Sequence, residues 1–135
     1  MTVESSKQRI LLVLLVIYAV ASLIHFVHNA EFISDYPNLP ASWSRADVYL
    51  AWAALTAVGI VGWFLVKRGH LMSGLAVLAI YAAGGLDSLG HYLLAPLSAH
   101  NFAMNSTILL EVTCAGLVLV EVMRQMLRRQ WINHV

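Results

Sequence analysis

Four long apolar stretches fill this chain of 135 residues and limit what it can fold into. A helix needs about 20 mostly apolar residues to cross a hydrocarbon core of roughly 30 Å, and each stretch is long enough. The expected spans are residues 10–33, 46–66, 71–94 and 102–127. The sequence therefore predicts an all-α integral membrane protein that forms a single transmembrane domain.

The links between these stretches are short and polar. Residues 34–45 contain two prolines, a tight turn is expected around Gly69, and Pro96 interrupts the last link. Ser44 and Asp47 have the spacing of a capping box that opens the second helix. Because short links make sequential helices antiparallel, we expect a four-helix bundle with up-down-up-down topology.

The distribution of Lys and Arg predicts the orientation of this bundle, because these residues are retained on the cytoplasmic side. With four spans, seven of the eight Lys and Arg residues fall on one side and Arg45 falls on the other. The seven are Lys7, Arg9, Lys67, Arg68, Arg124, Arg128 and Arg129. Both termini are thus expected in the cytoplasm. A cleaved signal peptide is the alternative for the first stretch, but its apolar run continues past the small residues near Ala19, which favours an uncleaved span.

Composition excludes several classes of protein. Hydrophobic residues make up 60% of the chain and charged residues only 11%, against about a quarter in soluble domains, so membrane lipids are the expected surroundings. The net charge of +1, without a dense basic stretch, argues against a nucleic-acid partner. Cys114 is the single cysteine, so no intramolecular disulfide can form. A bacterial inner membrane and a eukaryotic endomembrane both fit this composition.

Several ionisable residues stand inside the expected spans, where such groups are costly and therefore point to function. With a rise of about 1.5 Å per residue, His25, Asp87 and Glu111 lie at one depth, roughly 12 Å below the outer boundary. His28 and His91 lie about 7 Å below it. His25 shares a helix face with His28, and Asp87 with His91, because residues three or four apart are neighbours. The sequence predicts an outward-facing intramembrane site.

The leading hypothesis for this site is a metal centre with possible redox activity. Imidazole and carboxylate groups are good ligands for iron, copper and zinc, and four-helix bundles hold such metals between facing helices. The expected ligands of a transition metal ion are His25, His28, Asp87, His91 and Glu111.

Haem is a second metal-based alternative, because the first and third helices would lie diagonally in the bundle. His28 and His91 would then be its two axial ligands. Asp87 and Glu111 would be left as buried acids beside an apolar macrocycle, which favours the small metal centre.

A competing hypothesis needs no metal. His25, Asp87 and Glu111 would be catalytic as a proton donor, a base and an electrostatic stabiliser around a hydrophobic small molecule.

A resemblance to a known family supports this second hypothesis. The segment IHFVHNAEF, which begins at Ile24, is followed by a proline-containing loop and three more spans. Together with Asp87 in the third span and Met104-Asn105 at the start of the fourth, this pattern resembles the EXPERA group, which includes emopamil-binding sterol isomerases and sigma-2 receptor-like proteins. The resemblance implies a cavity for a sterol or another hydrophobic, amine-like ligand. His25 and an acid such as Glu31 or Asp87 would handle protons or pair with a cation.

A third hypothesis makes the chain a non-catalytic subunit of a larger membrane complex or a homo-oligomer. Its small size and minimal loops fit this role, and its polar residues would then form interhelical hydrogen bonds. No chain of polar residues reaches the cytoplasmic half, which argues against an ion channel.

Overall fold

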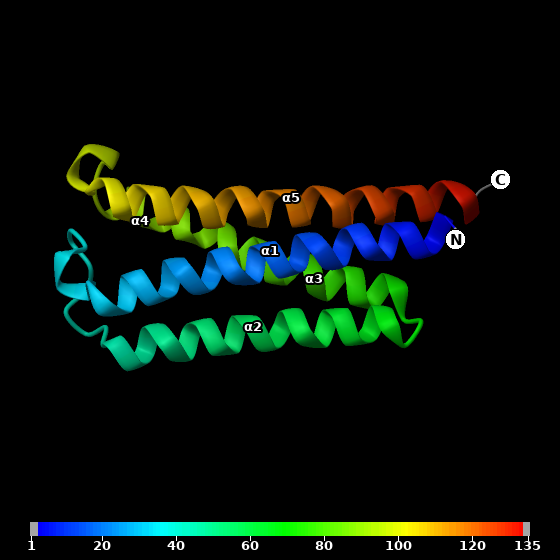
Figure 1. The fold of residues 1–135 in the computed structure, drawn as a ribbon, viewed down its shortest axis with the longest axis horizontal. Helices are drawn as coiled ribbons and strands as arrows, with labels where there is room; N and C mark the ends of the chain where they lie inside the picture. Colours follow the sequence, from blue (N-terminus) through cyan, green and yellow to red (C-terminus); the bar gives the residue numbers. More distant parts are fainter. Residues whose placement is uncertain (1–2, 134–135) are drawn as a thin grey trace.

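The protein is a bundle of four long helices (Figure 1). The computed structural model describes residues 3–133, with side chains for residues 8–129. The long helices are α1 (Val3–Glu31), α2 (Arg45–Lys67), α3 (Leu71–Leu86) and α5 (Phe102–Asn133). Short 3₁₀ segments η1 (Ile33–Asp35), η2 (Asp87–Gly90) and η3 (Leu97–Ala99) and the single turn α4 (His91–Leu94) complete the chain.

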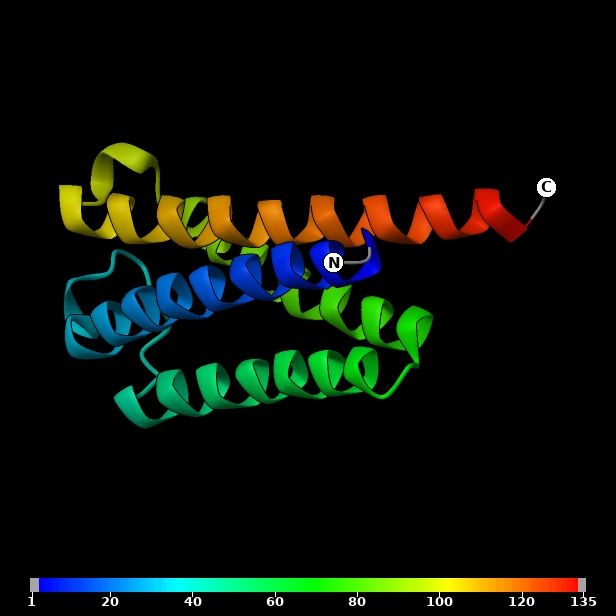
Figure 2. The same cartoon turned by 45° about the vertical axis from the view of Figure 1, so that its right-hand side comes forward.

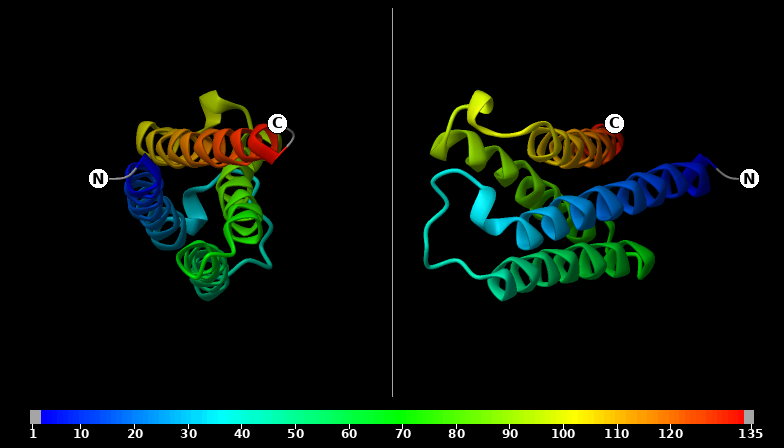
Figure 3. Two further views of the ribbon diagram at one scale, coloured as in Figure 1. Left: turned by 90° about the vertical axis from the view of Figure 1, so that its right-hand side faces the viewer. Right: turned by 60° about the vertical axis from the view of Figure 1, so that its left-hand side comes forward.

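Consecutive helices run antiparallel around the bundle. Helix α1 packs against α2 and α5, and α3 packs against the same two helices, so α1 and α3 lie on a diagonal (Figure 3, left). The two ends of the described chain and the α2–α3 turn lie at one end of the bundle, here called the terminal end (Figure 1). The links that contain η1 and η3 lie at the opposite end, here called the loop end, and α5 continues past the other helices at the terminal end (Figure 2). The predicted up-down-up-down topology is confirmed, and the side of the membrane that each end faces stays a prediction.

All four expected spans are present as helices. Segments long and apolar enough to cross a membrane are Gln8–Glu31, Arg45–Lys67, Leu71–Leu94 and Phe102–Arg129. Many large apolar side chains on them point outward, which is the pattern of a surface that lies in lipid. The chain is therefore a small multi-pass membrane protein.

Local signals explain where α2 begins and ends. The Ser44 side chain accepts a hydrogen bond from the Asp47 backbone N–H at 3.3 Å, and the Ser44 backbone N–H donates to Asp47 Oδ2 at 2.9 Å. This is the predicted capping box, which satisfies backbone donors at the helix start. Gly69 follows the helix with a φ of +86°, a conformation that favours glycine and turns the chain into α3.

On α1 and α5, the residues that point into the bundle recur at alternating intervals of three and four positions, which is the spacing of a coiled-coil seam. From Tyr18 to Leu11 on α1 and from Ala115 to Val122 on α5 this seam is largely apolar. Towards the loop end it becomes polar on α1 from Ser22 and carries an acid on α5. The buried α1 positions include Leu11, Leu15, Tyr18, Ser22, His25 and Asn29, and those on α5 include Met104, Ile108, Glu111, Ala115, Val118 and Val122. The bundle therefore has an apolar core at one end and a polar core at the other.

We expected residues 71–94 to form one continuous α-helix, but this third span is interrupted. Helix α3 ends at Leu86, and the chain tightens into η2 before it resumes as α4. Gly84 and Gly85 immediately precede the change, and adjacent glycines weaken an α-helix. The change of winding alters which side chains of this segment point into the bundle.

Candidate functional site

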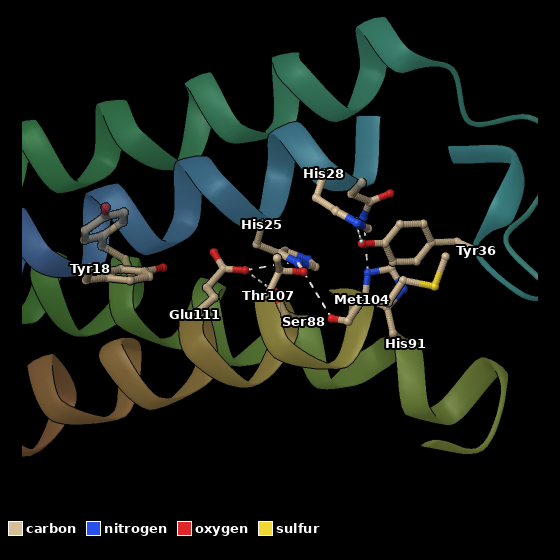
Figure 4. A network of polar contacts seen from close by, with 11 residues as sticks. Tyr18, His25, His28, Tyr36, Ser88, His91, Met104, Thr107 and Glu111 are labelled. Carbon is tan, nitrogen blue, oxygen red and sulfur yellow. Dashed lines mark hydrogen bonds and ion pairs between the residues drawn. The ribbon is translucent and has the colours of Figure 1, made fainter. Parts of the chain in front are cut away.

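A carboxylate from α5 and an imidazole from α1 meet inside the polar core (Figure 4). Glu111 is 0% exposed and His25 is 2% exposed. His25 Nε2 lies 3.7 Å from Glu111 Oε2. The structure therefore brings together two of the three residues that we placed at one depth, and we call them the His25–Glu111 pair.

Besides His25, Glu111 has a hydroxyl neighbour but no Lys or Arg partner among the described side chains. Ser88 Oγ donates a hydrogen bond to Glu111 Oε2 at 2.5 Å. Among the described side chains, the Lys and Arg ion pairs reach Glu31 and Glu121 but not Glu111. Glu111 Oε1 has no hydrogen-bond partner among the described atoms. Because a buried carboxylate is costly without compensating partners, Glu111 depends on His25 and Ser88.

The other ring nitrogen of His25 decides how this pair shares a proton. His25 Nδ1 lies 3.3 Å from Thr107 Oγ1, and the Thr107 hydroxyl donates to the Met104 carbonyl at 3.1 Å. Because the threonine proton is used there, Thr107 accepts from His25, and we assign the hydrogen of the neutral ring to Nδ1. His25 Nε2 is then a free base that faces Glu111. The pair can hold one proton, on either Nε2 or Oε2.

A second polar layer lies nearer the loop end and is organised by Tyr36. This residue comes from the link after η1 and is buried against the bundle. Its hydroxyl lies 2.9 Å from His28 Nδ1, and its ring centroid lies 4.9 Å from that of His91. Burial raises the pKa of Tyr36 to about 12. Tyr36 therefore keeps its proton at neutral pH.

His91 connects this layer to the His25–Glu111 pair. Its ring centroid lies 5.5 Å from that of His25, with the rings edge to face. Asn29 Nδ2 donates to His91 Nε2 at 3.2 Å. His28 and His91 thus both contact Tyr36, on the loop-end side of His25 (Figure 4).

Asp87 does not join these residues, because its side chain is exposed. The prediction that Asp87 and His91 share a face assumed α-helical winding of about 100° per residue. A 3₁₀ segment winds by about 120° per residue, so residues three apart eclipse each other. Ser88 and His91 therefore both point inward, and Asp87 points away from the pair.

Sequence reasoning missed four residues of this site. Ser88 was overlooked because its inward position depends on the change of winding, and Tyr36 because nothing in a proline-containing link indicates that it folds back over the bundle. For Thr107 and His100, only the position in the sequence hints at a place in the site. His100 follows Pro96 closely, and Thr107 lies four residues before Glu111, which places both side chains on one face of α5.

The expected metal ligands do not converge in this arrangement. Among the described residues, no group of three or more His, Cys, Asp or Glu side chains is placed to hold a metal ion. Both ring nitrogens of His25 have polar neighbours, His91 Nε2 accepts from Asn29, and Asp87 is exposed. Binding of a transition metal ion or of haem stays a prediction.

Elemental analysis and an optical spectrum of mildly solubilised, untagged protein check the metal hypothesis directly. If the cluster is a metal centre, we expect one metal per chain and its loss in a double variant, His25→Ala with His91→Ala. Replacing the exposed His70, which lies at the terminal end, with alanine is the matched control. Metal-free wild-type protein would rule out this hypothesis.

A groove lies on the outside of the bundle, beside the helix that carries His25. It lies between α1 and α2 and has a volume of about 170 Å³. Tyr81 of α3 reaches it because Gly59 has no side chain, and a Cβ there would lie 2.8 Å from Tyr81 Cε1. The lining residues are Leu12, Leu15, Val16, Ala19, Thr56, Gly59, Ile60, Trp63 and Tyr81.

The groove and the His25–Glu111 pair are connected through Tyr18. The Tyr18 ring lies 4.5 Å from the Tyr81 ring, and the Tyr18 hydroxyl donates to the Tyr81 carbonyl at 3.1 Å (Figure 4). Ser22 and His25 follow Tyr18 on successive turns of the same face of α1. A molecule in the groove would therefore lie about two helical turns from the pair.

Comparisons with protein-family models, with curated proteins and with solved structures find no match to this chain.

Proposed function

We propose that this small multi-pass membrane protein is a membrane-embedded acid–base site. In this function the His25–Glu111 pair transfers a proton to or from a hydrophobic molecule that is dissolved in the bilayer. The observation that carries the proposal is a fully buried carboxylate whose only basic partner, among the described side chains, is an imidazole.

The chemistry of the pair supports this proposal. An ionisable group buried in a membrane helix costs several kcal/mol unless it is paired, so such groups are by default functional-site candidates. Each partner can hold the single proton, and Thr107 and Ser88 fix the geometry on either side. This is the arrangement that general acid–base catalysis requires.

The groove between α1 and α2 supports a substrate from the lipid phase. Its lining is almost entirely apolar, with Thr56 and Tyr81 as its polar side chains. It opens within the span of each helix, where an apolar molecule can enter laterally from the bilayer.

The EXPERA-like resemblance fits this proposal with a change of acid. His25 lies in the resembling segment and belongs to the pair. Glu31 forms an ion pair with Arg45 at 3.2 Å and accepts from the Tyr49 hydroxyl at 2.9 Å, both on the surface. Asp87 is exposed. We therefore propose Glu111, rather than Glu31 or Asp87, as the acid that works with His25 on a sterol or another hydrophobic ligand.

Deuterium transfer tests this proposal and does not require the ligand to be identified first. Purified protein in nanodiscs is incubated in D₂O with a total lipid extract from its source, and the lipids are then analysed by mass spectrometry. If the pair exchanges protons with carbon, one lipid-soluble species should gain deuterium with the wild type. Glu111→Gln should abolish this gain, because the amide keeps the acceptor for Ser88 but cannot transfer a proton.

Glu121→Gln is the matched control, since it makes the same change on the same helix. Glu121 lies in the terminal half, where it pairs with Arg124 at 2.7 Å. Deuterium incorporation that is equal in the wild type and in Glu111→Gln would refute the acid–base function.

A further inference from the structure

The loop end of the bundle contains a hollow beside the buried residue Tyr36. It has a volume of about 210 Å³ and is formed by the link between η1 and α2. Tyr36 is one of its lining residues and is also the buried residue that contacts His28 and His91. Tyr36 therefore has the loop-end surroundings on one side and the polar core on the other.

From Tyr36 a series of proton-carrying side chains leads to Glu111 (Figure 4). The ring centroids of Tyr36 and His91 lie 4.9 Å apart, and those of His91 and His25 lie 5.5 Å apart. His25 Nε2 then lies 3.7 Å from Glu111 Oε2. His28 extends the series sideways through its contact with the Tyr36 hydroxyl.

Two buried acceptors beside this series lack donors among the described atoms. Asn29 Oδ1 has no hydrogen-bond partner, although its amide group donates to His91. His100 Nδ1 lies 3.1 Å from the Pro96 carbonyl, so it carries the ring hydrogen and leaves Nε2 as an acceptor without a partner. The His100 ring contacts both His91 and Tyr36, at 6.2 and 6.5 Å between centroids. Internal water molecules supply the O–H donors that such acceptors need.

The opposite direction offers no comparable series. Between Tyr18 and the terminal end, the buried seam of α1 continues with Leu15 and Leu11, and α5 contributes Val118 and Val122. Glu121 and Gln125, farther along α5, bond to each other at 2.8 Å. Within the described core, polar contacts with the His25–Glu111 pair therefore lead only to the loop end.

We propose that Tyr36, His91 and His25, together with internal water, form a proton path from the loop end to Glu111. The inference rests on the proposed function, because it describes how the acid–base site regains or releases its proton. A hydronium ion in the hollow gives up one proton and becomes water, and each carrier along the path accepts one proton and releases one. His25 accepts the proton on Nε2, its free nitrogen, and releases it to Glu111 Oε2. The titratable groups that face the path are His28, Tyr92 and His100, while Asp87 lies outside it on η2.

The rate of hydrogen–deuterium exchange at the Glu111 carboxyl tests this path. Full-length protein in nanodiscs is transferred into D₂O, and the carboxyl C=O stretching band is followed by infrared spectroscopy. The part of the band that Glu111→Gln removes belongs to Glu111. His91→Phe should slow the exchange on the order of a hundredfold, because it replaces a proton carrier by an apolar ring.

Tyr36→Phe provides a second, milder variant, because it removes only the hydroxyl that contacts His28. It should also slow the exchange. The exposed His70 gives the matched control, since His70→Phe makes the same change at the terminal end and should leave the rate unchanged. A merely structural role of His91 or Tyr36 predicts the opposite effect, because a loosened bundle admits water and exchanges faster.

An unchanged or faster rate in both His91→Phe and Tyr36→Phe overturns the path. The deuterium-transfer assay separates that result from failure of the proposed function. Loss of lipid labelling in Glu111→Gln, combined with unchanged carboxyl exchange in the two variants, rejects the path alone. Slow exchange in the variants, combined with undiminished labelling in Glu111→Gln, supports the path and rejects the acid–base function.

Discussion

Replacing His25 with leucine is expected to lower the free energy of unfolding by about 3 kcal/mol, the cost of removing one partner of a buried pair. The substitution leaves Glu111 in the core with Ser88 as its remaining polar contact among the described side chains. Adding Glu111→Met should recover most of the loss, because an apolar pair of similar size needs no compensation for buried charge. Unfolding in lipid bicelles measures the free energy of unfolding of the wild type, of each single variant and of the double variant.

The double variant makes this prediction specific. A cavity at position 25 would cost stability whatever residue stands at position 111, so the second substitution would then recover nothing. His70→Leu, at an exposed position, is the control for the residue type and should be nearly neutral. Unfolding free energies that add for the two substitutions would mean that His25 and Glu111 do not interact energetically.

Gly74→Ala should have an effect of similar size through close packing of α2 and α3. A Cβ at Gly74 would lie 2.6 Å from Val66 Cγ2 and 2.7 Å from the Val66 backbone nitrogen. Because a backbone atom cannot move aside as a side chain does, the two helices must separate. We expect a loss of about 3 kcal/mol, at the upper end of the usual cost of overpacking.

Gly116→Ala is the matched control for this substitution. Gly116 stands within α5 with open space around the position of a Cβ. Alanine there should stabilise the protein by about 0.5 to 1 kcal/mol, because it favours the helix without a clash. If both variants unfolded with the same free energy as the wild type, close approach at Gly74 would contribute nothing to stability.

The spans and their links could be predicted from the sequence because they follow from simple physical requirements. The length of an apolar run sets a membrane helix, and Ser44 with Asp47 satisfies the backbone donors at the start of α2. Helical rise alone placed His25 and Glu111 at one depth, and the structure brings them within 3.7 Å. The depth of a residue along its helix is insensitive to small changes in winding, so this part of the site could be predicted from the sequence.

The direction in which each side chain points around its helix could not be predicted from the sequence in the same way. A single 3₁₀ turn exchanges the inward positions of Asp87 and Ser88, and the energies that favour it come from the packing of the third span as well as from its glycines. The position of Tyr36 depends on how the link returns to the bundle, where the Asn38 side chain donates to the Leu94 carbonyl at 2.8 Å. Such tertiary contacts have no local sequence pattern.

The depth of Glu111 makes the site sensitive to membrane voltage. Glu111 lies about 14 Å along α5 from Phe102, roughly half of a hydrocarbon core of about 30 Å. A full crossing by one elementary charge is worth about 2.3 kcal/mol per 100 mV, so a proton that reaches Glu111 from the loop end gains or loses about 1 kcal/mol. The sign of this change depends on which side of the membrane the loop end faces. Because an apolar stretch of core, which includes Leu11, Leu15, Val118 and Val122, blocks onward passage, voltage would set how often the acid is loaded without driving a current.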